Sequence, residues 1–252
     1  MSERDCVIRL KNVTKLFPSG NSRPSLLRLL LGKVSERWSP ETFTALRSIN
    51  LEVKRSERLA VIGSNGSGKS TLLRVVAGLH RPTSGTVEAH GAQTLLAGLG
   101  VGMVDELTVE ENIFLYGAIY SIMRQDLRKS IVEILEWGDL TEFRLAPLKT
   151  LSTGMRSRLA FSVTRYIVPD IYLLDEALTA GDQNFRDKCD VVFKSYAQRG
   201  STMLIATHDF DFVERHCTRV LWLDHGQQVN LGPTADVLEL YRKDWATRHH
   251  RA

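Results

Sequence analysis

Apolar residues along the chain follow strand-like patterns in several separate places. Val7–Leu10 and Leu51–Val53 alternate apolar with polar positions, as half-buried strands do. Leu59–Ile62, Ile171–Leu174 and Met203–Ala206 are short, nearly uninterrupted apolar runs. Runs of this kind are typical of buried strands in a parallel sheet, because both faces of such a sheet are covered. The pattern therefore predicts a sheet with a fully buried centre.

The order of the elements predicts an α/β fold. The strand Leu59–Ile62 enters a glycine-rich loop, and Ser70–Leu79 follows with helical spacing and stops before a proline. Strand, loop and helix in that order form one unit of a parallel α/β sheet. Near the end, Val220–Leu223 and Gln227–Leu231 flank a tight turn and predict a hairpin. Asp236–Tyr241 and the tail after it predict a short terminal helix.

The stretch from Thr108 to about Arg165 has a helical pattern instead. Thr108 and Glu111 form a capping-box sequence, which marks the start of a helix. Apolar residues then recur at helical spacing: Ile113, Leu115, Ile119, Ile122, Ile131, Ile134 and Leu135. We interpret residues 108–165 as a helical insertion in the α/β core.

A second insertion lies between the first two predicted strands, at about residues 22–43. It carries an apolar face with basic residues beside it, namely Leu26, Leu27, Arg28, Leu29, Leu30, Leu31, Lys33, Val34 and Arg37. This composition predicts a short basic amphipathic helix. Such a helix could lie at a membrane interface, or it could be an ordinary surface helix that covers a sheet edge.

Composition limits the class of protein. The chain has 252 residues, of which 43% are apolar and 25% charged, and a net charge of +4, which fits a globular protein with an acidic partner. Its three cysteines, Cys6, Cys189 and Cys217, are too sparse for a disulfide framework. No uninterrupted apolar segment reaches the ~18 residues of a spanning helix, and the start lacks a signal core. We expect a cytosolic protein or one bound to the cytosolic side of a membrane.

A phosphate-binding loop is the most specific motif. The loop matches G-x-x-x-x-G-K-[ST] with Gly63, Ser64, Asn65, Gly66, Ser67, Gly68, Lys69, Ser70 and Thr71. Glycines let consecutive backbone N–H groups point at a polyphosphate, and the helix that follows adds its positive end. Lys69 would reach the β- and γ-phosphates, and the Ser70 hydroxyl would bind Mg²⁺. A chance glycine-serine loop is the alternative, but the motif lies between the strand and helix that it requires.

Two further strand ends carry candidate catalytic groups. The apolar strand Ile171–Leu174 ends in Asp175, placed to hold Mg²⁺ through water, and Glu176, placed to activate the attacking water. Taken alone, this pair would be a solvated acidic turn; the phosphate loop upstream favours the catalytic interpretation. His208 follows the strand Met203–Ala206 and could contact the γ-phosphate, although a lone histidine after a strand is usually structural.

Taken together, these motifs resemble the ATP-binding cassette (ABC) family. Leu151-Ser152-Thr153-Gly154-Met155 resembles the family's signature motif and opens a helical pattern, and Asp182 matches the final acid of its D-loop. The resemblance implies a single nucleotide-binding domain over residues 1–252, with a RecA-like core, an antiparallel β-subdomain and a helical signature subdomain. It also implies ATP and Mg²⁺ as cofactors, and a homodimer in which Ser152 and Gly154 contact the γ-phosphate held by the other subunit.

Some positions depart from the family pattern. Thr153 and Met155 replace the usual glycine and glutamine of the signature. The glutamine that the family places between the sheet and the helical subdomain has no clear counterpart, because Gln93 lies too early. The aromatic that stacks on adenine could be Phe17 or Phe43, and the place of Phe17 after the first strand favours Phe17.

The departures themselves resemble one subfamily, the ATPases of bacterial surface-polysaccharide export (the Wzt, KpsT and TagH types). The resemblance rests on the insertion at 22–43, on the glycine-rich Leu95–Met103 stretch followed by Glu106-Leu107-Thr108, and on Ser152-Thr153-Gly154-Met155 followed by Arg158. It implies a short form without a carbohydrate-binding domain.

This subfamily resemblance implies a motor subunit on the cytoplasmic face of the bacterial inner membrane. Its partners would be a separate transmembrane permease and, through the permease, a lipid-linked polysaccharide such as O-antigen, capsule or teichoic acid; no nucleic acid is expected. The alternatives are an ABC ATPase for another transported substrate, a soluble ABC ATPase acting on ribosomes or DNA, and a catalytically inactive regulatory cassette. One cassette without sustained heptads argues against the second of these, and Glu176 with His208 argues against the third.

Overall fold

The computed structural model describes residues 5–18, 42–175 and 183–249. The described ranges therefore leave out Glu176, Asp182 and the expected amphipathic helix. Of the 22–43 insertion they include only residues 42 and 43. Nine strands are described: β1 (Cys6–Pro18), β2 (Thr42–Lys54), β3 (Arg58–Ile62), β4 (Ser84–Ala89), β5 (Gln93–Ala97), β6 (Ile171–Asp175), β7 (Thr202–Ala206), β8 (Arg219–Asp224) and β9 (Gln227–Pro233). The described helices are α2 (Lys69–Val76), α3 (Val109–Ile119), α4 (Arg124–Trp137), α5 (Thr153–Thr164), α6 (Gln183–Gln198), α7 (Phe210–His216) and α8 (Thr234–His249), with short 3₁₀ turns at Thr141–Phe143 and Leu148–Thr150.

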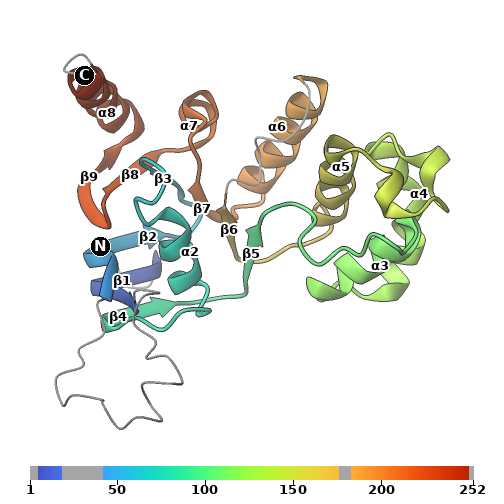
Figure 1. Ribbon diagram of the computed structural model, residues 1–252, viewed down its shortest axis with the longest axis horizontal. Coiled ribbons are helices and arrows are strands. Elements are labelled where there is room, and N and C mark those ends of the chain that lie inside the picture. Colours follow the sequence, from blue (N-terminus) through green and yellow to red (C-terminus); the bar gives the residue numbers. More distant parts are fainter. Residues whose placement is uncertain (1–4, 19–41, 176–182, 250–252) are drawn as a thin grey trace, which may run out of the picture.

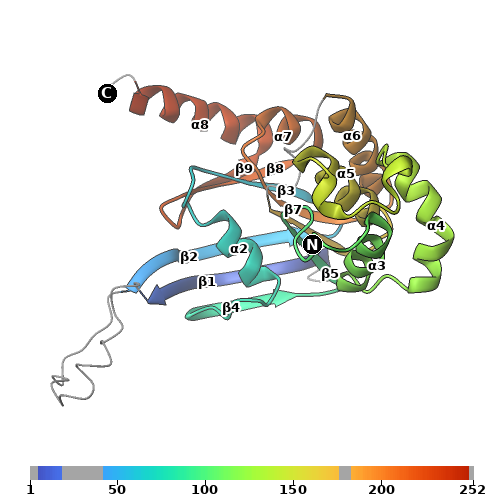
Figure 2. The same cartoon turned by 45° about the vertical axis from the view of Figure 1, so that its right-hand side comes forward.

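Two sheets form the framework of the molecule. A three-stranded antiparallel sheet has the order β2-β1-β4, and a six-stranded sheet has the order β5-β6-β7-β3-β8-β9. In the larger sheet only β9 runs antiparallel to its neighbour. Figure 2 shows α2 between the two sheets, while α6, α7 and α8 lie on the other face of the larger sheet. The expected α/β fold with an antiparallel β-subdomain is confirmed.

The centre of the larger sheet is buried on both faces, as the apolar runs predicted. In β3, Leu59 and Val61 belong to the core shared with α2 and the small sheet, while Ala60 and Ile62 belong to the core under α6 and α7. Strands β6 and β7 divide their side chains between the same two cores. Alternate residues of a strand point to opposite faces, so a continuous apolar run supplies both cores at once.

The helical part has a hydrophobic core of its own. Side chains from α3, α4 and α5 pack together in it, including Ile113, Tyr116, Ile131 and Leu159. Thr108 caps α3 in a complete capping box with Glu111. In Figure 1 these three helices lie beyond the edge of the larger sheet that β5 and β6 form, away from α2. The signature segment therefore lies on a separate packed unit.

Candidate nucleotide-binding site

The phosphate loop follows β3 and leads directly into α2, and its glycines are required by the backbone. Gly63 has φ 146°, and a Cβ there would lie 2.1 Å from the Leu223 carbonyl oxygen. Gly68 has φ 106°, and a Cβ there would lie 2.6 Å from the Ala45 carbonyl oxygen. Both positions combine a left-handed conformation with a close backbone approach, which only glycine accommodates. The loop is thus held tightly between β2 and β8.

Lys69 is nearly buried at the start of α2. Its Nζ donates hydrogen bonds to the carbonyl oxygens of Gly63, at 2.9 Å, and Ser64, at 3.0 Å. The ammonium group therefore lies across the mouth of the loop, where the inward-facing N–H groups would surround a phosphate. A nucleotide phosphate would find this positive charge already in place.

Ser70 and Asp175 meet although they are far apart in the sequence. The Ser70 Oγ donates a hydrogen bond to Asp175 Oδ1 at 2.8 Å. This contact brings the end of strand β6 to the first turn of α2. A hydroxyl and a carboxylate side by side are the hard oxygen donors that Mg²⁺ prefers. The residues present fit the expected metal, and these two would hold it.

A cavity of about 380 Å³ adjoins the phosphate loop on the side of β2. Its lining consists of Phe43, Ala45, Asn65, Gly66, Gly68, Lys69, Ser70 and Thr71. Phe43 leaves 58% of its surface exposed there. Phe17, the aromatic that the sequence favoured, instead packs edge-on against His80, with ring centroids 5.3 Å apart. Strand pairing places Phe17 opposite Phe43, and of the two it is Phe43 that lines this cavity.

His208 lies on the other side of the phosphate loop. It lines a second cavity of about 500 Å³ together with Gly63, Ser64 and Asn65 of the loop, Phe210, and Tyr241, Arg242 and Trp245 of α8. The sequence analysis expected a terminal helix over Asp236–Tyr241 and the tail, but it did not connect that helix with the phosphate loop. Trp245, an isolated aromatic residue in a polar tail, was the available signal.

Ser152 caps the signature helix α5. Its Oγ accepts a hydrogen bond from the Met155 N–H at 3.3 Å. A Cβ added at Gly154 would meet no atom within 4 Å, so packing among the described residues does not require glycine at this position. Figure 1 shows α5 well apart from α2, on the far side of β5 and β6. The signature segment of one chain is thus remote from the phosphate loop of that chain.

The register of β5 explains why Gln93 is an unsuitable counterpart of the family glutamine. Ala97, at the end of β5, pairs with Asp175, whereas Gln93 pairs with Ile171 at the other end. Four residues of strand separate Gln93 from the Asp175 end, about 13 Å. The residues that leave the sheet next to the site are Ala97 and Gly98.

The sequence matches one family model, described as ABC transporter, over residues 46–179. The chain belongs to the ABC transporter family. The chain is therefore an ATP-binding cassette. The match begins within β2, ahead of the phosphate loop, and extends past Asp175 and the signature segment.

The cassette is also similar to named export proteins. It is 36% identical over 250 residues to "O-antigen export system ATP-binding protein RfbB" of Myxococcus xanthus, covering 96% of this chain and 57% of that protein. It is 34% identical to the protein of the same name from Klebsiella pneumoniae, covering 95% and 99%. It is 35% identical to "Teichoic acids export ATP-binding protein TagH" of Bacillus anthracis, covering 93% and 42%. The cassette thus spans nearly the whole Klebsiella protein and about half of the other two.

A solved structure supports the fold assignment. The described chain matches a dimeric bacterial ABC transporter cassette with a TM-score of 0.67 and 25% identity, over 90% of this chain and 98% of that one. The family and the fold expected from the motifs are both confirmed.

Proposed function

We propose that the cassette binds Mg·ATP at its phosphate loop and hydrolyses it as one half of a head-to-tail homodimer. The contact between Ser70 and Asp175 carries this proposal, because it joins the phosphate loop to the acidic end of β6. Lys69 would neutralise the β- and γ-phosphates, and Ser70 with Asp175 would hold the metal. When bound, Mg²⁺ would supply positive charge that offsets the negative charge of the phosphate groups.

Hydrolysis also requires groups that act on the attacking water and the γ-phosphate. Glu176 follows Asp175 directly in the sequence, so we assign it the role of orienting or deprotonating that water. His208 lies beside the outer side of the loop with Gly63, Ser64 and Asn65, which supports a contact with the γ-phosphate. Phe43 borders the cavity next to the loop, and we assign it, rather than Phe17, to stack on adenine.

The remote position of the signature helix supports a shared site. Ser152 and Gly154 stand at the N-terminal end of α5, where free N–H groups and the helix dipole favour an anion. The open space at Gly154 would let a phosphate of a second chain approach the backbone closely. Thr153, Met155 and the D-loop acid Asp182 would then face the partner as well.

We further propose that the cassette powers export of a lipid-linked surface polysaccharide. Relatives named for O-antigen and teichoic acid export, each at least 34% identical over most of this chain, support this substrate class. Among the described residues no helix is both long enough and apolar enough to cross a membrane. A separate permease would form the path, with the cassette bound to it at the cytoplasmic face of the inner membrane.

Reconstitution tests the transport role. The ATPase rate of the cassette is measured alone, and then with the permease encoded beside its gene, in lipid with and without candidate lipid-linked glycans. We expect the permease to bind the cassette and the cognate glycan to change the rate. The Glu176→Gln cassette serves as control, since it should bind ATP without turnover. If neither the permease nor any glycan changes the ATPase rate, the ATPase assignment stands and the export role is wrong.

A further inference from the structure

The segment that follows β5 has two parts, which differ in glycine content and in hydrogen bonding. Residues 98–102 contain three glycines, Gly98, Gly100 and Gly102, with φ of 80°, 86° and 93°. Glycine lacks a Cβ and adopts positive and negative φ at little steric cost, so this backbone is less restricted than that of other residues. Residues 104–108, in contrast, are held by several hydrogen bonds. A glycine-rich stretch next to the nucleotide site thus leads into a hydrogen-bonded one.

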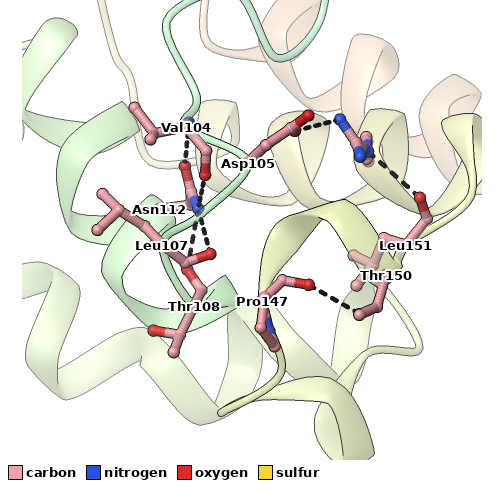
Figure 3. A network of polar contacts seen from close by, with 9 residues as sticks. Val104, Asp105, Leu107, Thr108, Asn112, Pro147, Thr150 and Leu151 are labelled. Carbon is pink, nitrogen blue, oxygen red and sulfur yellow. Dashed lines mark hydrogen bonds and ion pairs between the residues drawn. The ribbon is translucent and has the colours of Figure 1, made fainter.

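Asn112 makes the second part rigid. Its side chain is completely buried. Its Oδ1 accepts from the Val104 N–H at 2.8 Å, and its Nδ2 donates to the carbonyl oxygens of Val104, Leu107 and Thr108 at 2.9, 3.2 and 2.9 Å. Figure 3 shows this amide pointing into the curve of the loop. The loop is therefore fixed to α3 and moves with it.

The outer side of the same loop is bound to the segment that precedes the signature. The Leu148 N–H donates to the Leu107 carbonyl at 2.8 Å, and the Lys149 N–H donates to the Asp105 carbonyl at 3.1 Å. Arg156 of α5 completes the connection. Its Nη1 donates to Asp105 Oδ1 at 2.5 Å, and its Nε donates to the Leu151 carbonyl at 3.2 Å.

Arg156 thus joins the loop to the residue directly before Ser152. The labelled residues Asp105 and Leu151 in Figure 3 are the two to which the guanidinium donates. Both side chains of the ion pair are a third to a half exposed, so the pair adds little to the stability of the fold. Its geometry has another consequence. One planar group fixes the distance between the loop after β5 and the N-cap of the signature helix.

We propose that Asp105 and Arg156 are positioning residues that set the signature N-terminus according to the position of the loop after β5. Asp175 pairs with Ala97 at the root of that loop, so a change at the metal site would shift the loop about its glycines. Asn112 and the Asp105–Arg156 bridge would pass the shift to Leu151 and Ser152. The link would take the place of the family glutamine between the sheet and the helical subdomain, because Gln93 lies too far from the Asp175 end of the sheet. It rests on the proposed function, since Ser152 would contact the ATP bound by the partner.

Hydrogen exchange of the nucleotide-free cassette tests the physical link. The Met155 and Arg156 amides are bonded to Ser152, so their exchange rates report the order of the signature N-terminus. We expect Asp105→Ala to raise these rates several-fold, as Arg156→Ala does. Unchanged rates in Asp105→Ala would overturn the link. This measurement needs neither hydrolysis nor dimerisation, so it stands apart from any failure of the proposed function.

Steady-state kinetics test the positioning role. We expect Arg156→Ala to lower kcat roughly tenfold while the ATP dissociation constant stays within about twofold, because the residue acts at the partner's site. Arg156→Lys should restore only part of the rate, since one ammonium cannot replace the two-pronged guanidinium. Asp105→Ala combined with Arg156→Ala should be no slower than Arg156→Ala alone.

The matched control is the ion pair between Arg144 and Glu110. It also joins two segments of the helical unit at 2.5 Å, with comparable exposure, but it does not touch the signature segment. Arg144→Ala should leave kcat, ATP affinity and exchange at Ser152–Arg156 unchanged. If Arg156→Ala behaves like Arg144→Ala, or if the two Ala changes at Asp105 and Arg156 add up, the bridge is an ordinary surface ion pair and the proposal is wrong.

Discussion

At the scale of single residues, the site separates groups that look equivalent in the sequence. Phe17 and Phe43 face each other across β1 and β2, yet Phe43 lines the cavity beside the phosphate loop, while Phe17 packs against His80. The pairing of these strands contains several register shifts, and each shift changes which face of the sheet a side chain occupies. The sequence therefore offered two aromatic candidates, but it could not show which of the two side chains points toward the phosphate loop.

The two phenylalanines give a direct prediction. Phe43→Ala should weaken ATP binding by roughly tenfold, since an aromatic stacked on a base contributes about 1–3 kcal/mol. Phe17→Ala should leave ATP affinity within about twofold, even if it lowers the melting temperature through the lost contact with His80. Calorimetric titration of both variants with ATP checks this. A larger loss of affinity in Phe17→Ala would return the stacking role to that residue.

At the scale of elements, α8 shows that a largely polar tail can form a regular helix. The sequence predicted a short terminal helix over Asp236–Tyr241 and the tail, and the structure has α8 over Thr234–His249. The turns after Tyr241 are largely polar, so they lack an apolar period. Ion pairs one turn apart stabilise them instead, between Lys243 and Glu239 and between Arg248 and Asp244. These turns place Trp245 beside the phosphate loop.

The loop held by Asn112 allows an element-scale prediction. Asn112→Ala should lower the free energy of unfolding by roughly 2–4 kcal/mol, because each buried polar group left without a partner costs about 1–3 kcal/mol. Asn50→Ala is the control. Asn50 also bonds backbone groups, those of Asn12 and Ser48, but at an exposed position where water can replace it. Urea unfolding followed by circular dichroism measures both; equal losses would mean that burial of Asn112 is not the cause.

At the scale of the whole molecule, the sequence was most informative where one residue type is physically required. The phosphate loop was recognised because Gly63 and Gly68 stand where a Cβ would collide with neighbouring carbonyls. The sheet centre was recognised because strands buried on two faces leave uninterrupted apolar runs. The bridge from Asp105 to Arg156 was not recognised, since each is an ordinary charged residue and only the fold brings the two together.

A mixing experiment tests the head-to-tail arrangement of the whole assembly. Lys69→Ala disables the phosphate loop, and Ser152→Arg blocks the signature, so each homodimer should be inactive. A mixed dimer pairs the intact loop of one chain with the intact signature of the other at one of its two sites. Mixing should therefore recover a measurable part of the ATPase rate, whereas a site built within one chain would give no recovery. Survival of hydrolysis in Ser152→Arg alone would contradict the shared site.

The pairing of Pro18 with Thr42 at the end of the small sheet has a consequence for how this cassette can change over evolutionary time. The chain departs from and returns to the sheet at adjacent points, one residue away from Phe43. Doubling the length of a connection between two such points costs only about 0.6 kcal/mol in closure entropy. Segments of very different length and composition can therefore be exchanged here with little effect on the fold. Descendants of one cassette could acquire new accessory sequences beside the cavity that Phe43 lines, while the phosphate loop and the two sheets stay the same.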